Sequence, residues 1–211
     1  MPAGTTGEDE DKGERSSAEA APKRPGRARR FILSLFFAVG LGSIALDLLT
    51  KTIAVDSLEG REPVKLLGGL VYFDLIRNGG AAWGMASEYT WVLSIVAICV
   101  SVGIAVFVWR VRSTPWAVAF GLIFGGALGN IVDRVFRAPA AFHGHVVDFI
   151  SPLEPGGQAY PVFNLADSSL VIGVCLVVLL ELTGRRMDGT RYSKDTDPKE
   201  TGEPAKESAG D

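Results

Sequence analysis

Apolar residues in this chain are concentrated in four long stretches that are separated and flanked by polar segments. The four stretches cover about residues 31–55, 89–109, 115–134 and 163–182. A helix of about 20 apolar residues crosses a bilayer, so each stretch is long enough to be a membrane span. We therefore predict an all-α polytopic membrane protein with four transmembrane helices, in one membrane domain that covers residues 31–184.

Two longer connections and two terminal tails lie outside the spans. In the connection of residues 56–88, the run Leu70–Ile76 is flanked by Gly and Asn and predicts one or two short strands at the membrane surface. The connection of residues 137–162 contains several Pro and Gly residues and is expected to be a loop. Residues 1–30 and 185–211 are polar and are predicted to be disordered tails.

Basic residues beside the spans predict how the chain is oriented. They precede the first span, close the second at Arg110 and Arg112, and follow the fourth at Arg185 and Arg186. Short basic flanks remain on the cytoplasmic side. Both termini are therefore expected in the cytoplasm, and both longer connections are expected at the outer face.

A basic region before an apolar stretch is also typical of a cleaved signal peptide. Here three further spans follow, and Asp47 and Lys51 extend the first stretch beyond the apolar core of a signal peptide. These features favour a first helix that is retained.

Composition excludes several classes of function. Apolar residues make up 47% of the chain, which soluble proteins also reach, so their distribution carries the membrane prediction. The basic residues form no patch interleaved with aromatics, which gives no case for nucleic-acid binding. Cys99 and Cys175 are too few and too isolated for a disulfide framework or a zinc site. His143 and His145 alone are a weak basis for a metal site, so we expect no metal, no cofactor and no obligate protein partner.

Uncommon polar residues lie where the spans meet the outer connections. Such residues are costly beside apolar helices and by default mark a functional site. With the orientation above, they converge on the outer face from separate segments. They are Asp47, Lys51, Asn78, Asp133, Arg134, Asp148 and Asp167.

Two of these residues form a candidate catalytic pair. Asp148 is expected on the loop before the fourth span, and Asp167 in the first turn of that span, on the same face as Asn164. Two carboxylates that share a site do not both ionise easily, so one can hold a proton while the other activates a water. Such a pair hydrolyses an amide without a metal or a covalent intermediate. The alternative is that each aspartate only caps a helix or pairs with a neighbour.

Each of the remaining polar residues could either belong to the site or have only a structural role. Asn130 and Arg134 are four residues apart and share a helix face, which favours a role in the site. Asp133 fits the site and an interfacial cap equally well. Asp47 and Lys51 have the spacing of a helical ion pair, which can serve the site or only make a charged helix end tolerable.

Five motifs of the chain resemble the bacterial lipoprotein signal peptidases, also called signal peptidase II. They occur in the order of that family and lie within Phe31–Leu182. They are DLLTK at Asp47–Lys51, NGGAAWG at Asn78–Gly84, GNIVDR at Gly129–Arg134, GHVVDFI at Gly144–Ile150 and FNLADSS at Phe163–Ser169.

The resemblance implies an aspartic endopeptidase of the bacterial plasma membrane. It implies cleavage of diacylglyceryl-modified prolipoproteins just before the lipidated cysteine, inhibition by globomycin-type peptides, and contact with membrane lipid. It also implies a small extracytoplasmic β-cradle, which Pro63–Ile76 fits, and it makes Asp148 and Asp167 the catalytic pair. The positions implied to bind substrate or shape the site are Asn130, Arg134, Asn164, Asn78, Gly80, Ala81, Asp47, Lys51 and Asp133.

One segment departs from the family, and two other functions stay open. Val135–His143 is longer than the equivalent segment of many members and predicts a lengthened outer loop. A proton-coupled transporter would use the same carboxylates, but it would place them near the bilayer midplane and often shows internal repeats, which the sequence lacks. A membrane scaffold would use the polar cluster only for helix packing and would tolerate Asp→Asn at both positions.

Overall fold

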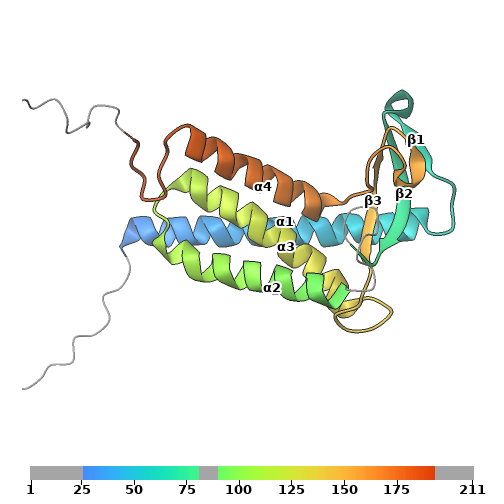
Figure 1. Ribbon diagram of the computed structural model, residues 1–211, viewed down its shortest axis with the longest axis horizontal. Helices are drawn as coiled ribbons and strands as arrows, with labels where there is room; N and C mark the ends of the chain where they lie inside the picture. The colour runs from blue at the N-terminus through green and yellow to red at the C-terminus, as the bar shows by residue number, and fades with distance from the viewer. Residues whose placement is uncertain (1–25, 81–89, 193–211) are drawn as a thin grey trace, which may run out of the picture.

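Four helices lie side by side and carry a small sheet at one end, which is called the sheet end below (Figure 1). The computed structural model describes residues 26–80 and 90–192. Each of the four helices is long and apolar enough to cross a membrane. They are α1 (Arg27–Leu58), α2 (Thr90–Phe107), α3 (Thr114–Phe136) and α4 (Leu165–Leu182). The predicted four-helix architecture is confirmed.

The two described chain ends lie away from the sheet, and both are more ordered than predicted (Figure 1). Residues 27–30 form the first turn of α1 and do not belong to a disordered tail. Residues 185–192 turn back, with a bridge between Arg185 and Arg191. The Trp116 Nε1–H holds this turn by donating to the Arg185 carbonyl at 2.9 Å. The rest of both predicted tails lies outside the described residues.

Helix α3 is the central helix and packs on the other three. Its glycines allow this close approach, because larger side chains would collide with neighbouring backbones. A Cβ on Gly125 would lie 2.5 Å from the Gly40 carbonyl oxygen of α1, and one on Gly126 would lie 2.4 Å from the Ala166 carbonyl oxygen of α4. The close packing predicted from the Gly-rich third span is confirmed.

Apolar side chains fill the bundle away from the sheet and also cover its outer surface. The fully buried Phe36 and the nearly buried Trp116 are large members of the inner core. Leu41 on α1 and Val178 on α4 are at least half exposed. An apolar outer surface on helices of this length is what a lipid environment requires.

The sheet is antiparallel, with strand order β1-β2-β3. Its strands are β1 (Val64–Leu66), β2 (Val71–Asn78) and β3 (Val146–Pro152). The strands expected within Pro63–Ile76 are present, and β2 continues two residues further. The expectation that residues 137–162 form only a loop is wrong, because β3 lies within them. Asp148 is therefore on a strand and pairs in register with Ile76.

Both faces of β3 are buried, which explains why it gave no alternating pattern. Val147 and Phe149 pack with Ala54 and Leu58 of α1 in a second apolar core. On its free edge, β3 bonds with the chain that enters α4, through reciprocal hydrogen bonds between Ile150 and Phe163. The strand that carries Asp148 is thus fixed to both α1 and the start of α4.

Candidate active site

Asp148 and Asp167 line the same cavity, where the sheet meets the helices. The cavity has a volume of about 720 Å³. Its walls are mostly apolar and come from α2 on one side, including Leu93 and Val96, and from α4 on the other, including Val171. The structure thus brings the two predicted aspartates into one largely apolar chamber.

The start of α4 fixes Asp167. Asn164 is the N-cap residue of this helix, and Asp167 lies in its first turn, as predicted. The Asn164 Oδ1 accepts from the Asp167 backbone N–H at 2.9 Å, and the Asp167 Oδ2 accepts from the Asn164 backbone N–H at 3.1 Å. This reciprocal capping box stabilises the helix end and holds the carboxylate in one orientation.

Asp148 is buried, with only 2% of its surface exposed. Its Oδ1 accepts from the Asn164 Nδ2 at 2.7 Å, and its Oδ2 accepts from the Asn78 Nδ2 at 2.9 Å. Burial, and next the charge of Asp167, raise the pKa of Asp148 to about 7, although the two asparagine bonds act in the opposite direction. The carboxyl group is therefore poised to hold or release a proton near neutral pH.

Amide groups bind all four oxygens of the aspartate pair. Three of these bonds involve Asn164 and Asn78, as described above. The fourth is donated by the Asn130 Nδ2 to the Asp167 Oδ1 at 2.8 Å. The three asparagines predicted to shape the site therefore all contact the aspartates, and each is a neutral donor that does not itself titrate.

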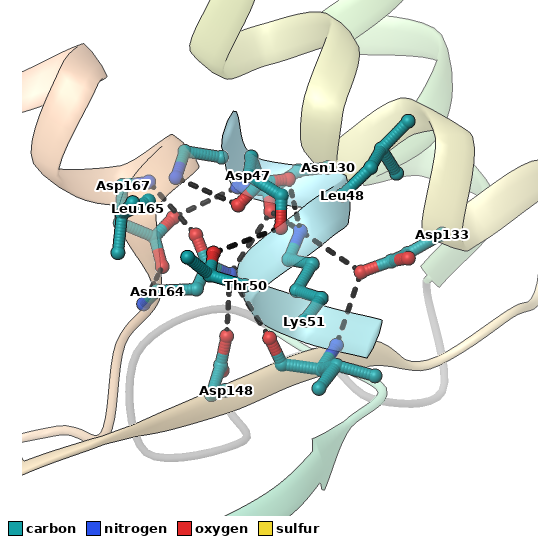
Figure 2. A network of polar contacts seen from close by, with 12 residues as sticks. Asp47, Leu48, Thr50, Lys51, Asn130, Asp133, Asp148, Asn164, Leu165 and Asp167 are labelled. Carbon is teal, nitrogen blue, oxygen red and sulfur yellow. Dashed lines mark hydrogen bonds and ion pairs between the residues drawn. The ribbon is translucent and has the colours of Figure 1, made fainter. Parts of the chain in front are cut away.

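A buried ion cluster lies behind the aspartate pair (Figure 2). Lys51 and Asp47 have no exposed surface, and Asp133 has 1%. The Lys51 Nζ lies 2.8 Å from the Asp47 Oδ2 and 2.9 Å from the Asp133 Oδ2. It also donates to the Asn130 Oδ1 at 3.1 Å. The Asp47–Lys51 pair is thus buried next to the residues that bind the aspartates and is not an exposed helix end.

Asp133 does not form an interfacial cap that reaches water. It accepts from the Val147 backbone N–H at 3.1 Å, and it also pairs with Arg137 at the start of the lengthened loop. Arg134 instead faces the cavity, where its Nη2 donates to the Gly80 carbonyl at 3.2 Å. The Arg134 Nε is buried and has no hydrogen-bond partner among the described residues.

The glycine-rich loop is described only at its start. Gly79 and Gly80 are buried, Gly80 lines the cavity, and its N–H donates to the Asn78 Oδ1 at 2.9 Å. Ala81 lies outside the described residues. Among the described residues, no three His, Cys, Asp or Glu side chains are placed to hold a metal ion.

Two contacts of the site were missed from the sequence. They are the backbone N–H of Val147, which binds Asp133, and that of Ala166, which donates to the Asp47 Oδ1 at 2.9 Å. No residue-type signal marks a backbone donor. The sequence left open whether Asp47 and Asp133 serve the site or only stabilise helix ends, and it did not indicate these partners.

The family profile of Signal peptidase (SPase) II matches residues 39–183 of the chain. The chain belongs to the signal peptidase II family. It is 46% identical to a lipoprotein signal peptidase of Rhodococcus jostii over 182 residues, which cover 86% of this chain and 88% of the relative. It is 44% identical to one of Mycobacterium avium, with 87% and 97% of the two chains covered. The protein is thus an aspartic endopeptidase of this family.

The fold is also similar to solved structures of a bacterial membrane enzyme. One, solved by the in meso method at 2.3 Å resolution, superposes with a TM-score of 0.62 at 30% identity, over 81% of this chain and 94% of that chain. A second, at 1.9 Å resolution, gives a TM-score of 0.61 at 31% identity, over 71% and 94%. These similarities support the four-helix architecture with its small sheet.

Proposed function

We propose that this signal peptidase II removes the signal peptide from prolipoproteins whose cysteine carries diacylglycerol, and cuts just before that cysteine. The observation that carries the proposal is the placement of two carboxylates in one apolar cavity, with each oxygen bound by an amide donor. Relatives that share more than 40% of their sequence with this chain are named lipoprotein signal peptidases.

The environments of the two aspartates support different roles. Asp148 holds the proton, because burial raises its pKa to about 7. Asp167 acts as the base, since the N-terminus of a helix favours an anion. Asp167 takes a proton from water, whose oxygen attacks the scissile carbonyl carbon, while Asp148 donates a hydrogen bond to the carbonyl oxygen. The C–N bond then breaks as Asp167 gives the proton that it took from water to the nitrogen of the amine leaving group.

The cavity walls support a lipid-modified substrate. Apolar side chains of α2 and α4 line the two sides and suit an extended signal peptide and acyl chains. The buried Arg134 Nε–H has no hydrogen-bond partner among the described residues, and Arg134 lines this cavity, so it is placed to donate to a peptide carbonyl of the substrate. Globomycin-type cyclic peptides are expected to compete for the same space.

The distribution of arginines supports an orientation with the site at the outer face of the plasma membrane. Three basic segments meet at the end away from the sheet. There, the Arg29 guanidinium lies over the Trp109 ring at 5.6 Å, and the Arg112 N–H donates to the Met187 carbonyl at 2.8 Å. Basic flanks remain cytoplasmic, so the sheet and the aspartate pair face outward.

Cleavage by Asp→Asn variants tests the catalytic assignment. We expect Asp148→Asn and Asp167→Asn to remain folded and to lose cleavage of a diacylglyceryl prolipoprotein, because either change leaves the pair without one ionisable group. Asp56→Asn is the matched control, since Asp56 is an exposed aspartate near the C-terminal end of α1, at the sheet end of the molecule.

The assay compares lipidated and unlipidated substrate in mass spectrometry of the products. Wild-type enzyme is expected to cut only the lipidated form, just before the modified cysteine. Normal cleavage by either site variant would refute the aspartate pair. Equal cleavage of both substrates would refute the lipid requirement.

A further inference from the structure

The ammonium group of Lys51 is surrounded by three oxygen atoms. Its Nζ forms ion pairs with the Asp47 Oδ2 at 2.8 Å and the Asp133 Oδ2 at 2.9 Å, and it donates a hydrogen bond to the Asn130 Oδ1 at 3.1 Å. A lysine without exposed surface is costly to bury unless its charge is paired and each donor is satisfied. Two carboxylates pair the charge of Lys51 and Asn130 accepts a hydrogen bond from it, but neither ionic partner is a member of the aspartate pair.

The two ionic partners of Lys51 hold the two halves of the aspartate pair in the same way. Asp133 accepts from the backbone N–H of Val147, the residue directly before Asp148. Asp47 accepts from the backbone N–H of Ala166, the residue directly before Asp167. One ammonium group thus connects, through two carboxylates, the strand that carries one aspartate and the helix that carries the other.

The third contact of Lys51 sets the orientation of Asn130. Because the Asn130 Oδ1 accepts from the Lys51 Nζ and from the Asn164 Nδ2, its Nδ2 is turned toward Asp167. A flipped amide would place two donors against each other and an acceptor against the carboxylate. Figure 2 shows Lys51 between Asn130 and Asp133, beside the aspartate pair.

We propose that Lys51 is a positioning residue that fixes the relative placement of Asp148 and Asp167 and helps to set how they share one proton. This inference rests on the peptidase function proposed above. It assigns to Lys51 a part in the reaction that is separate from helix packing and from contact with the substrate.

The charges around the pair predict the sign of its electrostatic effect. The charged groups that face it are Asp47 and Lys51 from α1, Asp133 and Arg134 from α3, Arg137 from the following loop, and Asp148 and Asp167 themselves. The charge of Lys51 lowers the pKa of Asp148, so its loss would raise that pKa. Loss of the negative charge of Asp47 would lower it.

Variants of Lys51 and Asp47 test the proposal in opposite directions. We expect Lys51→Met to reduce kcat about 100-fold with little change in KM, since a misplacement of about 1 Å has that effect on a catalytic group. The alkaline limb of its pH–rate profile, where activity falls, should move to higher pH than in the wild type, because Asp148 keeps its proton up to a higher pH. Asp47→Asn should shift this alkaline limb to lower pH. Lys51→Arg should leave the limb at the wild-type pH but lower the rate.

Phe36→Ala is the matched control for lost packing. Phe36 lies on the same helix, has no exposed surface and belongs to the core away from the site. This variant is expected to lower the melting temperature without a change in the pH profile. If Lys51→Met and Asp47→Asn behave like Phe36→Ala, with an unshifted limb and rates that follow only the amount of folded enzyme, the proposal is overturned.

A readout that needs no turnover separates this proposal from the proposed function. Infrared difference spectroscopy follows the protonated carboxyl stretch of Asp148 during a pH titration, with Asp148→Asn to identify the band. The band should persist to higher pH in Lys51→Met and disappear at lower pH in Asp47→Asn, whichever substrate the enzyme cuts. An unshifted titration in both variants would refute the role of Lys51 even if prolipoprotein cleavage is confirmed.

Discussion

Asn164 joins the two aspartates, so its replacement gives a prediction with a worked magnitude. Asn164→Ser keeps an oxygen that can cap α4, because serine is a good N-cap residue. Serine is too short to reach Asp148, so the hydrogen bond of 2.7 Å from Asn164 to that carboxylate is lost. Asn164→Ala removes both the cap and the donor.

The two losses have different sizes and different readouts. A hydrogen bond to a charged group contributes about 1.5–3 kcal/mol. At about 1.4 kcal/mol for one pKa unit, its loss would raise the pKa of Asp148 from about 7 by about 1–2 units. Loss of the cap costs about 1 kcal/mol of stability, which only the alanine variant should show.

The sign of the pH effect follows from the proton that Asp148 holds. In the proposed mechanism the active enzyme has one proton on the pair, so the rate is expected to fall at high pH as Asp148 ionises. Both variants should therefore move the alkaline limb of the pH–rate profile for a lipidated peptide to higher pH. Differential scanning fluorimetry in detergent should show a lower melting temperature for Asn164→Ala than for Asn164→Ser.

Thr183→Ala is a suitable control, because Thr183 makes a similar local bond to the Leu179 carbonyl at the far end of α4. It should leave the limb unchanged. An alkaline limb that stays at the wild-type pH in both Asn164 variants would show that Asp148 does not hold the catalytic proton. A limb that moves to lower pH would reverse the roles assigned to the two aspartates.

Two further predictions concern stability and orientation. Because the pKa of Asp148 is raised from 3.8 to about 7, the folded state binds more protons than the unfolded state in this interval, and stability should fall as pH rises from about 4 to 7. Asp148→Asn should lose part of this slope in melting curves, whereas Asp56→Asn should keep it; an unchanged slope would contradict burial as the cause. A reporter fused after Arg112 should be active in the cytoplasm and one after Ala141 outside, and the reverse pattern would place the site on the wrong face.

The sequence predicted the membrane part of the fold well, because lipid imposes a simple rule. Each span must be a long apolar run with its backbone satisfied internally, and four such runs are visible in the chain. Strand β3 follows no such rule. It is buried on both faces and interrupted by Asp148, so neither a period of two nor a long apolar run marks it.

The site was predictable as a set of residues but not as a set of contacts. Asn78, Asn130 and Asn164 stand out as polar residues beside apolar spans, and all three bind the aspartates. Their partners depend on how β3 and α4 meet α1, which are contacts between segments far apart in the chain. The sequence placed Lys51 beside Asp47, whereas its contacts with Asp133 and Asn130 required the fold.

The two aspartates differ because the backbone around them differs. Asp167 lies at the start of a helix, where aligned N–H groups favour an anion. Asp148 lies on a strand, which has only a small net dipole, and is 2% exposed. Among the described residues, the donors that replace water around its negative charge are the side chains of Asn78 and Asn164. In the proposed mechanism, two identical side chains in one cavity thereby act as a base and an acid, as catalysis by a carboxyl pair requires. The small sheet would then have a chemical role, because it provides the second aspartate with a site away from any helix end.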